Sequence, residues 1–127
     1  MKLKLYKYQG AGNDFLIADN RDGSICLTPE QIAGLCDRRY GVGADGLMLL
    51  DAPHYDLESG CSDAFRMTYY NSDGSGGMMC GNGGRCIVAF AADMGISEFS
   101  FSAADGRHYA EILAEDGRTK TVRLQMQ

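Results

Sequence analysis

The chain is organised around residues 71–95, which read NSDGSGGMMCGNGGRCIVAFAADMG. The first five of these residues predict a turn, because Asn, Asp and Gly accept the left-handed backbone conformations that turns require. From Asn82 to Met94 apolar side chains cover most of a helical circumference, and Gly95 stands where a C-terminal cap glycine belongs. A helix that is apolar nearly all round must be buried nearly all round, so we expect a central buried helix here.

Upstream of this helix, the sequence patterns predict strands and one outer helix. Residues 28–31, Thr-Pro-Glu-Gln, supply an N-cap, a proline at the first helical position and a capping-box glutamine, which predicts a helix from about Pro29 to Arg38. Polar and apolar residues that alternate, glycine breaks and short apolar runs predict the strands. We expect strands on both sides of a glycine turn at residues 10–14 and at residues 47–50 and 65–70, and a surface loop at residues 52–63.

Downstream of the helix, three short strand-like runs are expected at residues 98–103, 108–114 and 119–125. Asp105-Gly106 and Asp116-Gly117 separate them and are good hairpin turns. No linker or repeat divides the chain, and its length of 127 residues is near that of one domain, about 100–150 residues. We therefore expect a single domain of residues 1–127 in the α+β class, with a mixed, mostly antiparallel sheet wrapped around the central helix.

The composition excludes several classes of partner. The chain has 12 Lys and Arg against 17 Asp and Glu, a net charge of −5, and no basic cluster longer than Arg38-Arg39, so neither nucleic acid nor an anionic membrane surface is expected. The longest apolar run, residues 87–92, is far short of the roughly 18–20 residues needed to cross a bilayer. Without a signal-type N-terminus, the five cysteines indicate reduced thiols, at least one of them unpaired, in a cytoplasmic protein.

The sequence contains no convincing cofactor motif. Gly41-Val42-Gly43-Ala44-Asp45-Gly46 matches the dinucleotide fingerprint as a string, but that fingerprint needs a strand before it and a helix after it. Here a helix precedes and a strand follows, which favours a tight helix-to-strand turn. The two histidines, His54 and His108, have no companion at metal-ligand spacing, so no metal and no other cofactor is expected.

Cys80 is the candidate reactive residue, because it directly precedes the expected central helix. Unpaired backbone N–H groups and the positive end of the helix dipole stabilise a thiolate at such a position. Gly81 and Gly83 let a ligand approach the backbone, and the same N–H groups would bind a carboxylate. A thiol beside a carboxylate site predicts chemistry at the α-carbon of an amino acid. The remaining cysteines, Cys26, Cys36, Cys61 and Cys86, are expected to be buried packing residues.

Three motifs resemble those of the diaminopimelate epimerase family. In chain order they are Lys7-Tyr8-Gln9-Gly10-Ala11-Gly12-Asn13-Asp14-Phe15, then Asp37-Arg38-Arg39-Tyr40-Gly41-Val42-Gly43-Ala44-Asp45-Gly46, and finally Asn71-x-Asp73-Gly74-Ser75 followed by Cys80-Gly81-Asn82-Gly83-x-Arg85-Cys86. Their order and spacing are those of the family, and the similarity spans nearly all of the chain. Proline racemases are similar at the Cys-Gly pair but carry His where this chain has Asn82.

The resemblance implies an isomerase that interconverts LL- and meso-diaminopimelate in lysine and peptidoglycan-precursor biosynthesis, with no cofactor. In such enzymes one cysteine removes the α-proton and a second cysteine delivers a proton to the opposite face. By its match to the motif, Cys80 is one catalytic acid/base. Asn13, Asn71, Gly81 and Asn82 correspond to substrate-binding positions, whose amide groups suit the ammonium and carboxylate groups of diaminopimelate.

The chain also departs from the family pattern. Some members carry Gln where Gly46 stands, and many carry an acidic residue after the Ser of the Asn-x-Asp-Gly-Ser motif, where this chain has Gly76-Gly77. The family is built from two similar halves with the site between them, so we expect these 127 residues to be the N-terminal half. The second cysteine, a Glu-Arg pair and the remaining substrate ligands would belong to a C-terminal half that is missing here, and this chain alone is expected to be inactive.

Two alternatives stay open from the sequence. One is a related cofactor-independent isomerase or racemase of the same fold that acts on another amino acid. The other is a non-catalytic fragment that associates with itself, for example as a homodimer, because a missing partner half exposes sheet edges and cleft surface.

Overall fold

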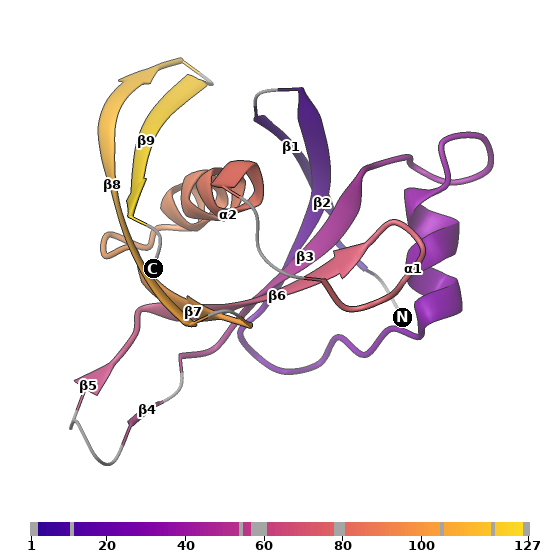
Figure 1. Cartoon of the computed structure of the whole chain (residues 1–127), viewed down its shortest axis with the longest axis horizontal. Coiled ribbons are helices and arrows are strands. Elements are labelled where there is room, and N and C mark those ends of the chain that lie inside the picture. Colours follow the sequence, from indigo (N-terminus) through magenta and orange to yellow (C-terminus); the bar gives the residue numbers. More distant parts are fainter. Residues whose placement is uncertain are drawn as a thin grey trace.

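The computed structural model describes residues 3–10, 12–53, 55–56, 61–77, 81–104, 106–117 and 119–125. The described residues form two helices and a series of strands, which confirms the α+β class (Figure 1). The elements are β1 (Tyr6–Gly10), β2 (Asn13–Asn20), α1 (Pro29–Cys36), β3 (Gly46–Asp51), β4 (Tyr55–Asp56), β5 (Cys61–Ser62), β6 (Phe65–Asn71), α2 (Gly81–Asp93), β7 (Ser100–Ala103), β8 (Gly106–Asp116) and β9 (Thr119–Gln125).

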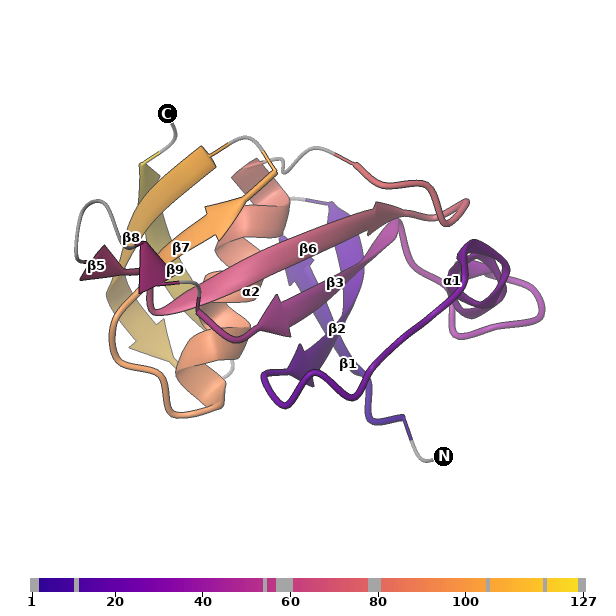
Figure 2. The ribbon, with the colours of Figure 1, turned by 90° about the horizontal axis from the view of Figure 1, so that it is seen from below.

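The main sheet has the strand order β1-β2-β3-β6-β7-β8-β9. Its β2–β3 and β6–β7 pairs are parallel, and its other neighbouring pairs are antiparallel, so the sheet is mixed and mostly antiparallel as expected. The sheet curls strongly, with α2 in the hollow between the β1 side and the β8–β9 hairpin and α1 on the outer side (Figures 1 and 2).

Each helix faces its own hydrophobic cluster, because successive side chains of a strand point to opposite faces. Phe15 and Met48 belong to the cluster around α2, whereas Leu16 and Leu47 belong to the cluster around α1. All six residues of β3 are buried, since both faces of that strand are covered. On α2 itself, seven residues are buried, while Arg85 and Asp93 are exposed.

The helix ends follow the sequence signals, except that α1 ends at Cys36 with Asp37 as its C-cap, short of the expected Arg38. Thr28 Oγ1 accepts from the Gln31 N–H at 3.1 Å and Gln31 Oε1 accepts from the Thr28 N–H at 2.8 Å, so the capping box is formed. At the C-terminus of α2, Gly95 has φ +89° and the Ile96 N–H donates to the Ala91 carbonyl at 3.0 Å, which closes the helix with a Schellman motif. Neither helix of the described residues has the length and apolar character needed to span a membrane.

Three local expectations are wrong. Residues 52–63 are not all loop, because Tyr55 pairs with Ser62 and Asp56 with Cys61; two-residue strands are too short to leave a periodic pattern. The first C-terminal turn begins one residue early, since Gly106 already pairs with Ala103 in the β7–β8 ladder. Cys26 is exposed, whereas Cys36 and Cys86 are buried as expected and the side chain of Cys61 lies outside the described part of the chain.

Candidate active site

Polar residues gather at the end of the sheet where β2 and β3 begin and β6 ends. The register sets this arrangement, because Gly46 at the start of β3 pairs with Phe15 of β2 on one side and with Asn71 of β6 on the other. Asn13 and Asn71 lie two residues from Phe15 and Tyr69, which pack on the α2 side of the sheet. Strand alternation therefore places Asn13, Gly46 and Asn71 on the face that carries α2.

The N-terminus of α2 meets this end of the sheet directly. Asn82 Nδ2 donates to Asn13 Oδ1 at 2.7 Å, which joins two of the expected substrate-binding residues. Close approach depends on Gly10, where a Cβ would lie 3.2 Å from Cys86 Sγ and 3.5 Å from the Asn82 carbonyl. The first turn of α2 contains no acidic side chain to compete for its N–H groups. The geometry therefore suits an anion at the helix N-terminus.

Of the remaining expected site residues, two are described and one is not. Gly81 is the first residue of α2, in the sequence position directly after Cys80, which lies outside the described residues. Asn71 is exposed and donates from Nδ2 to Ser75 Oγ at 3.1 Å, so it is tied into its own turn. Ser75 Oγ in turn donates to Asp73 at 2.6 Å, which lowers the pKa of that carboxyl group.

That turn is docked against α1 through Gly74. The residue has φ +88°, and a Cβ on it would lie 2.2 Å from the Pro29 carbonyl oxygen. Both the backbone conformation and the contact therefore require glycine. The loop after β6 is thus held between the sheet and the first turn of α1.

Two glycines at the departures from the family pattern, Gly46 and Gly77, face one side chain, Tyr69, whereas a Cβ on Gly76 would meet nothing within 4 Å. A Cβ on Gly46 would lie 2.8 Å from the Tyr69 hydroxyl oxygen, and a Cβ on Gly77 would lie 2.7 Å from the Tyr69 ring. The ring also packs edge-on against Phe15, with centroids 6.0 Å apart. Tyr69 therefore occupies the space that a side chain at either glycine would need.

A charged cluster lies beside Asn13 and accepts a hydrogen bond from its side chain. Asp45 Oδ2 accepts from Asn13 Nδ2 at 3.1 Å and from the Asp14 N–H at 3.0 Å. The Arg38 guanidinium donates to Asp45 Oδ1 at 2.9 Å and to both carboxylate oxygens of Asp14, at 2.8 and 3.1 Å. Lys7 Nζ lies 3.1 Å from the Asp14 carboxylate. We call Asp14, Arg38 and Asp45 the site clamp.

The site clamp keeps its carboxylates ionised. Hydrogen bonds from Arg38 hold the pKa of Asp14 well below its usual range despite its burial. Hydrogen bonds from Asn13 and from the Asp14 backbone lower the pKa of Asp45.

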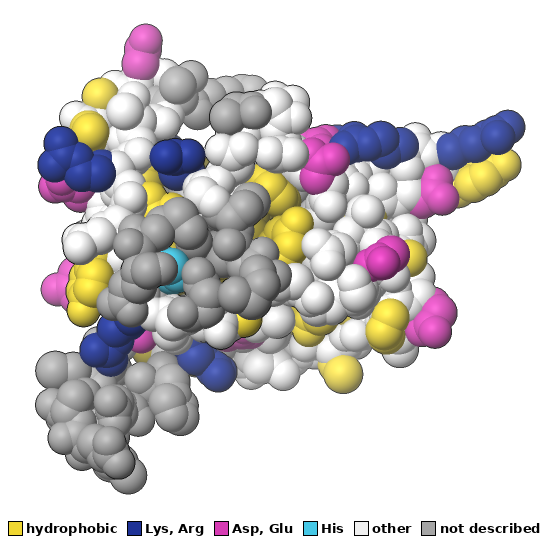
Figure 3. Space-filling view, in the orientation of Figure 1, with side chains coloured by type: hydrophobic (Ala, Val, Ile, Leu, Met, Phe, Trp, Pro, Cys, Tyr) yellow, Lys and Arg dark blue, Asp and Glu magenta, His cyan; other side chains and the backbone are white. Residues whose placement is uncertain are grey.

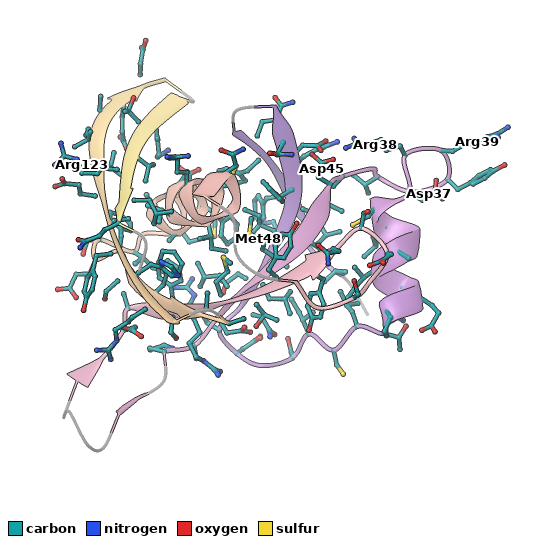
Figure 4. All side chains as sticks on the ribbon, in the orientation of Figure 1. Asp37, Arg38, Arg39, Asp45, Met48 and Arg123 are labelled. Carbon is teal, nitrogen blue, oxygen red and sulfur yellow. The ribbon has the colours of Figure 1, made fainter. Side chains whose placement is uncertain are left out.

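Arg38 points towards Asp45, whereas its neighbour Arg39 points away from the body of the protein (Figure 4). Arg39 and the 84% exposed Tyr40 belong to the loop after α1, and basic and hydrophobic side chains form the projection at the right of Figure 3.

Sequence reasoning placed these three residues inside the motifs but did not assign them to the site. The available signal was Asp14, an acidic residue at the start of an otherwise apolar strand, since a buried carboxylate requires a cation. Its partners are remote in sequence, and no local pattern identifies them.

The glycine cluster at residues 41–46 forms the tight helix-to-strand turn that was expected. Gly43 has φ +87°, and a Cβ on Gly41 would lie only 2.0 Å from the Gly34 carbonyl oxygen. The turn lies between α1 and β3 and brings Asp45 to the start of β3. Among the residues that the structure describes, no group of three or more His, Cys, Asp or Glu side chains is arranged to hold a metal ion.

Comparison with known proteins places the chain among close relatives. A family model described as diaminopimelate epimerase matches residues 5–126. A diaminopimelate epimerase of Flavobacterium psychrophilum is 51% identical over 120 residues, which are 90% of this chain and 43% of the relative. One of Chlorobaculum tepidum is 47% identical over 121 residues, 92% of this chain and 43% of the relative. The chain thus spans 43% of the length of these two relatives. The chain belongs to the diaminopimelate epimerase family.

Proposed function

We propose that this chain supplies the N-terminal half of a cytoplasmic epimerase that interconverts LL- and meso-diaminopimelate in lysine and peptidoglycan-precursor biosynthesis. Cys80 is one of its two acid/base residues, and the second cysteine belongs to a C-terminal half. Neither pyridoxal phosphate nor a metal takes part. The substrate class rests on the names of the relatives and on the motifs that they share with this chain.

The observation that carries the proposal is the 2.7 Å hydrogen bond from Asn82 Nδ2, on the first turn of α2, to Asn13 Oδ1 on β2. It joins two motifs that are remote in the sequence beside a helix N-terminus. Cys80 directly precedes that helix in the sequence, so the proposed site has its thiol beside the helix N–H groups. A thiolate is stabilised there, and so is a carboxylate on the carbon that it deprotonates.

The chemistry follows from these groups. The Cys80 thiolate removes the α-proton, and the electron pair left on the α-carbon is delocalised into the adjacent carboxylate. Preorganised N–H donors stabilise the added charge by about 3–4 kcal/mol per donor in comparable sites. The second thiol then delivers a proton to the opposite face, which inverts the carbon. Asn13, Asn71, Gly81 and Asn82 hold the ammonium and carboxylate groups.

A chimera tests the proposal. In it this chain replaces the matching 120-residue segment of the Flavobacterium psychrophilum relative, and epimerisation of diaminopimelate is followed as deuterium uptake at the α-carbon. We expect turnover by the chimera and a loss of about 10²–10⁴-fold in Cys80→Ser, the range for removal of an acid/base group. The matched control is Cys26→Ser, which removes an exposed thiol from the same chain and leaves turnover unchanged.

Unimpaired turnover by the Cys80→Ser chimera contradicts the catalytic role of Cys80. Epimerisation by the 127-residue chain alone, at the rate of the chimera, contradicts the half-site. A panel of other amino acids separates diaminopimelate epimerisation from racemisation of a different substrate, the first alternative.

The second alternative, a self-associating fragment, has one structural observation in its favour. β1 and β9 are the two end strands of the described sheet, and a groove of about 1010 Å³ lies between them, lined by α2. Unpaired strand edges favour pairing with another chain. Sedimentation and ligand titration of the chain alone separate this fragment from a monomeric half-enzyme: a dimer that does not bind diaminopimelate favours the self-associating fragment.

A further inference from the structure

The Asn13 and Asn82 side chains have a property that matters for binding. A carboxamide presents an acceptor oxygen on one side and a donor NH₂ on the other, with almost the same shape. Rotation by 180° therefore exchanges a donor for an acceptor without moving the side chain. Which group faces a ligand depends on what fixes the rotation.

We propose that Asp45 is a positioning residue that fixes the orientation of the Asn13 amide and, through it, of the Asn82 amide at the N-terminus of α2. This inference deepens the proposed function and rests on it for the identity of the ligand.

The first step of the argument is the chemistry of Asp45 Oδ2. An ionised carboxylate accepts hydrogen bonds and donates none. Oδ2 accepts from the Asp14 backbone N–H at 3.0 Å, which cannot turn away, and from Asn13 at 3.1 Å. Asn13 must therefore face Asp45 with its NH₂ group.

The second step carries this orientation to the helix. With its NH₂ group on Asp45, Asn13 offers Oδ1 on its opposite side, where Asn82 lies at 2.7 Å. Asn82 must then donate from Nδ2, which leaves its own Oδ1 as the outward group. That oxygen accepts from Arg85 at 3.4 Å, a weak contact that a ligand can replace. Asn82 thus presents an acceptor, which suits an ammonium group, beside helix N–H groups that suit a carboxylate.

The third step is the role of Arg38. Its Nη2 lies 2.9 Å from Asp45 Oδ1 and 2.8 Å from Asp14 Oδ1. The Asp45 N–H also donates to the Asp14 carbonyl at 2.9 Å, so the two acidic residues hold each other in place. An amide at position 45 would point its NH₂ group either at Arg38 or at Asn13 and the Asp14 N–H. The first choice opposes one donor and the second opposes two, so only a carboxylate satisfies every neighbour.

The test uses the 127-residue chain, with the side-chain NH₂ signals of Asn13 and Asn82 assigned by nuclear magnetic resonance. Asp45→Asn is expected to speed hydrogen exchange of both NH₂ groups by about tenfold or more, the effect of losing a hydrogen bond to a charged group. Asp45→Glu keeps an acceptor-only carboxylate and is expected to restore part of the protection. The matched control is Asp19→Asn, whose carboxylate also pairs with an arginine, at 2.7 Å, and is similarly exposed. Exchange in this control stays unchanged.

A measurement on the unaltered chain keeps the test independent of how the variants fold. The proposed orientation requires a nuclear Overhauser contact between the Asn13 NH₂ protons and the Asp14 amide proton, since both point at Asp45 Oδ2. Absence of this contact, or equal exchange in Asp45→Asn and the unaltered chain, overturns the proposal.

Titration with diaminopimelate, followed at the Gly81 and Asn82 backbone amides, separates the two proposals. We expect shifts in the unaltered chain and weaker binding in Asp45→Asn, recovered in part by Asp45→Glu. No shift in the unaltered chain counts against the proposed substrate, while the exchange data still decide the role of Asp45. Equal affinity of the unaltered chain and Asp45→Asn overturns the positioning role alone.

Discussion

Two charged clusters, one near each end of α2, bury opposite charges. The site clamp joins Asp14, Arg38 and Asp45 beside the helix N-terminus. Near the C-terminus, Asp93 of α2 accepts from the Tyr8 hydroxyl of β1 and lies 2.6 Å from Lys120 Nζ of β9. We call Tyr8, Asp93 and Lys120 the strand clamp. Burial and then the hydrogen bond to Asp93 raise the pKa of the Tyr8 hydroxyl.

The two clamps differ in which charge is buried. In the site clamp the Asp14 side chain is 10% exposed and its cation Arg38 is 57% exposed. In the strand clamp the cation Lys120 is 10% exposed and Asp93 is 40% exposed. A buried charge that loses its partner costs far more than an exposed one. The site clamp also binds backbone N–H groups and fixes amide direction, whereas the strand clamp joins side chains of three elements and holds strands together.

The largest expected effect comes from Phe90→Ala, which removes core packing around α2 and the apolar support under Tyr8 of the strand clamp. Phe90 is fully buried and packs against the Tyr6 and Tyr8 rings, with centroids 5.2 and 5.7 Å away. We expect a loss of about 3–5 kcal/mol in the free energy of unfolding, measured with urea. Phe90→Leu, a smaller change at the same place, should cost much less. An unchanged free energy of unfolding in Phe90→Ala would show that packing under Tyr8 does not matter.

An intermediate effect is expected for Asp14→Asn. Its pKa is lowered in the folded protein, so its contribution is fully present above the unfolded pKa of about 3.9 and is lost as pH falls towards the folded pKa. We expect Asp14→Asn to lose about 2 kcal/mol of stability near neutral pH and to flatten the acid side of the stability profile. Urea unfolding between about pH 6 and pH 2 measures both.

Glu98→Gln serves as the control, because Glu98 is exposed and belongs to neither clamp. If Asp14→Asn and Glu98→Gln give the same pH profile, the site clamp does not contribute to acid stability.

The remaining variants test the reversed burial in the strand clamp, and the smallest effect is expected for the exposed control pair. Lys120→Met leaves a partly exposed carboxylate and should cost about 1 kcal/mol or less, while Asp93→Asn leaves a buried ammonium and should cost about 2 kcal/mol. Arg123→Gln, in an exposed pair with Glu111, should change the unfolding free energy by close to zero. Thermal unfolding of the three variants gives the order, and a larger loss in Lys120→Met than in Asp93→Asn would reverse the assignment of the buried charge.

The parts of the fold that sequence predicted well have local causes. The capping box of α1, the cap glycine of α2 and the continuous apolar run of β3 each lie within a few residues, and each was confirmed. The β4–β5 hairpin was missed because two-residue strands leave no period to detect.

The site was predictable only in part, for a related reason. The motifs named Asn13 and Asn82, but their mutual bond depends on how α2 packs against β1 and β2. The site clamp depends on side chains that β2 and the segment between α1 and β3 bring together, and nothing local connects Asp14 to Arg38. The role of Cys80 stays a prediction, which the chimera tests.

The contact of Gly74 with Pro29 has a consequence for the order of folding. The turn after β6 reaches its final place only when the first turn of α1 exists to receive it, so its formation waits for a contact that is remote in sequence. The β8–β9 hairpin needs only neighbouring residues, and local contacts form faster than remote ones. In pulse-labelled hydrogen exchange, the β8–β9 amides should gain protection first and residues 71–75 late, so the end of the sheet that carries the proposed site becomes native after the β8–β9 hairpin.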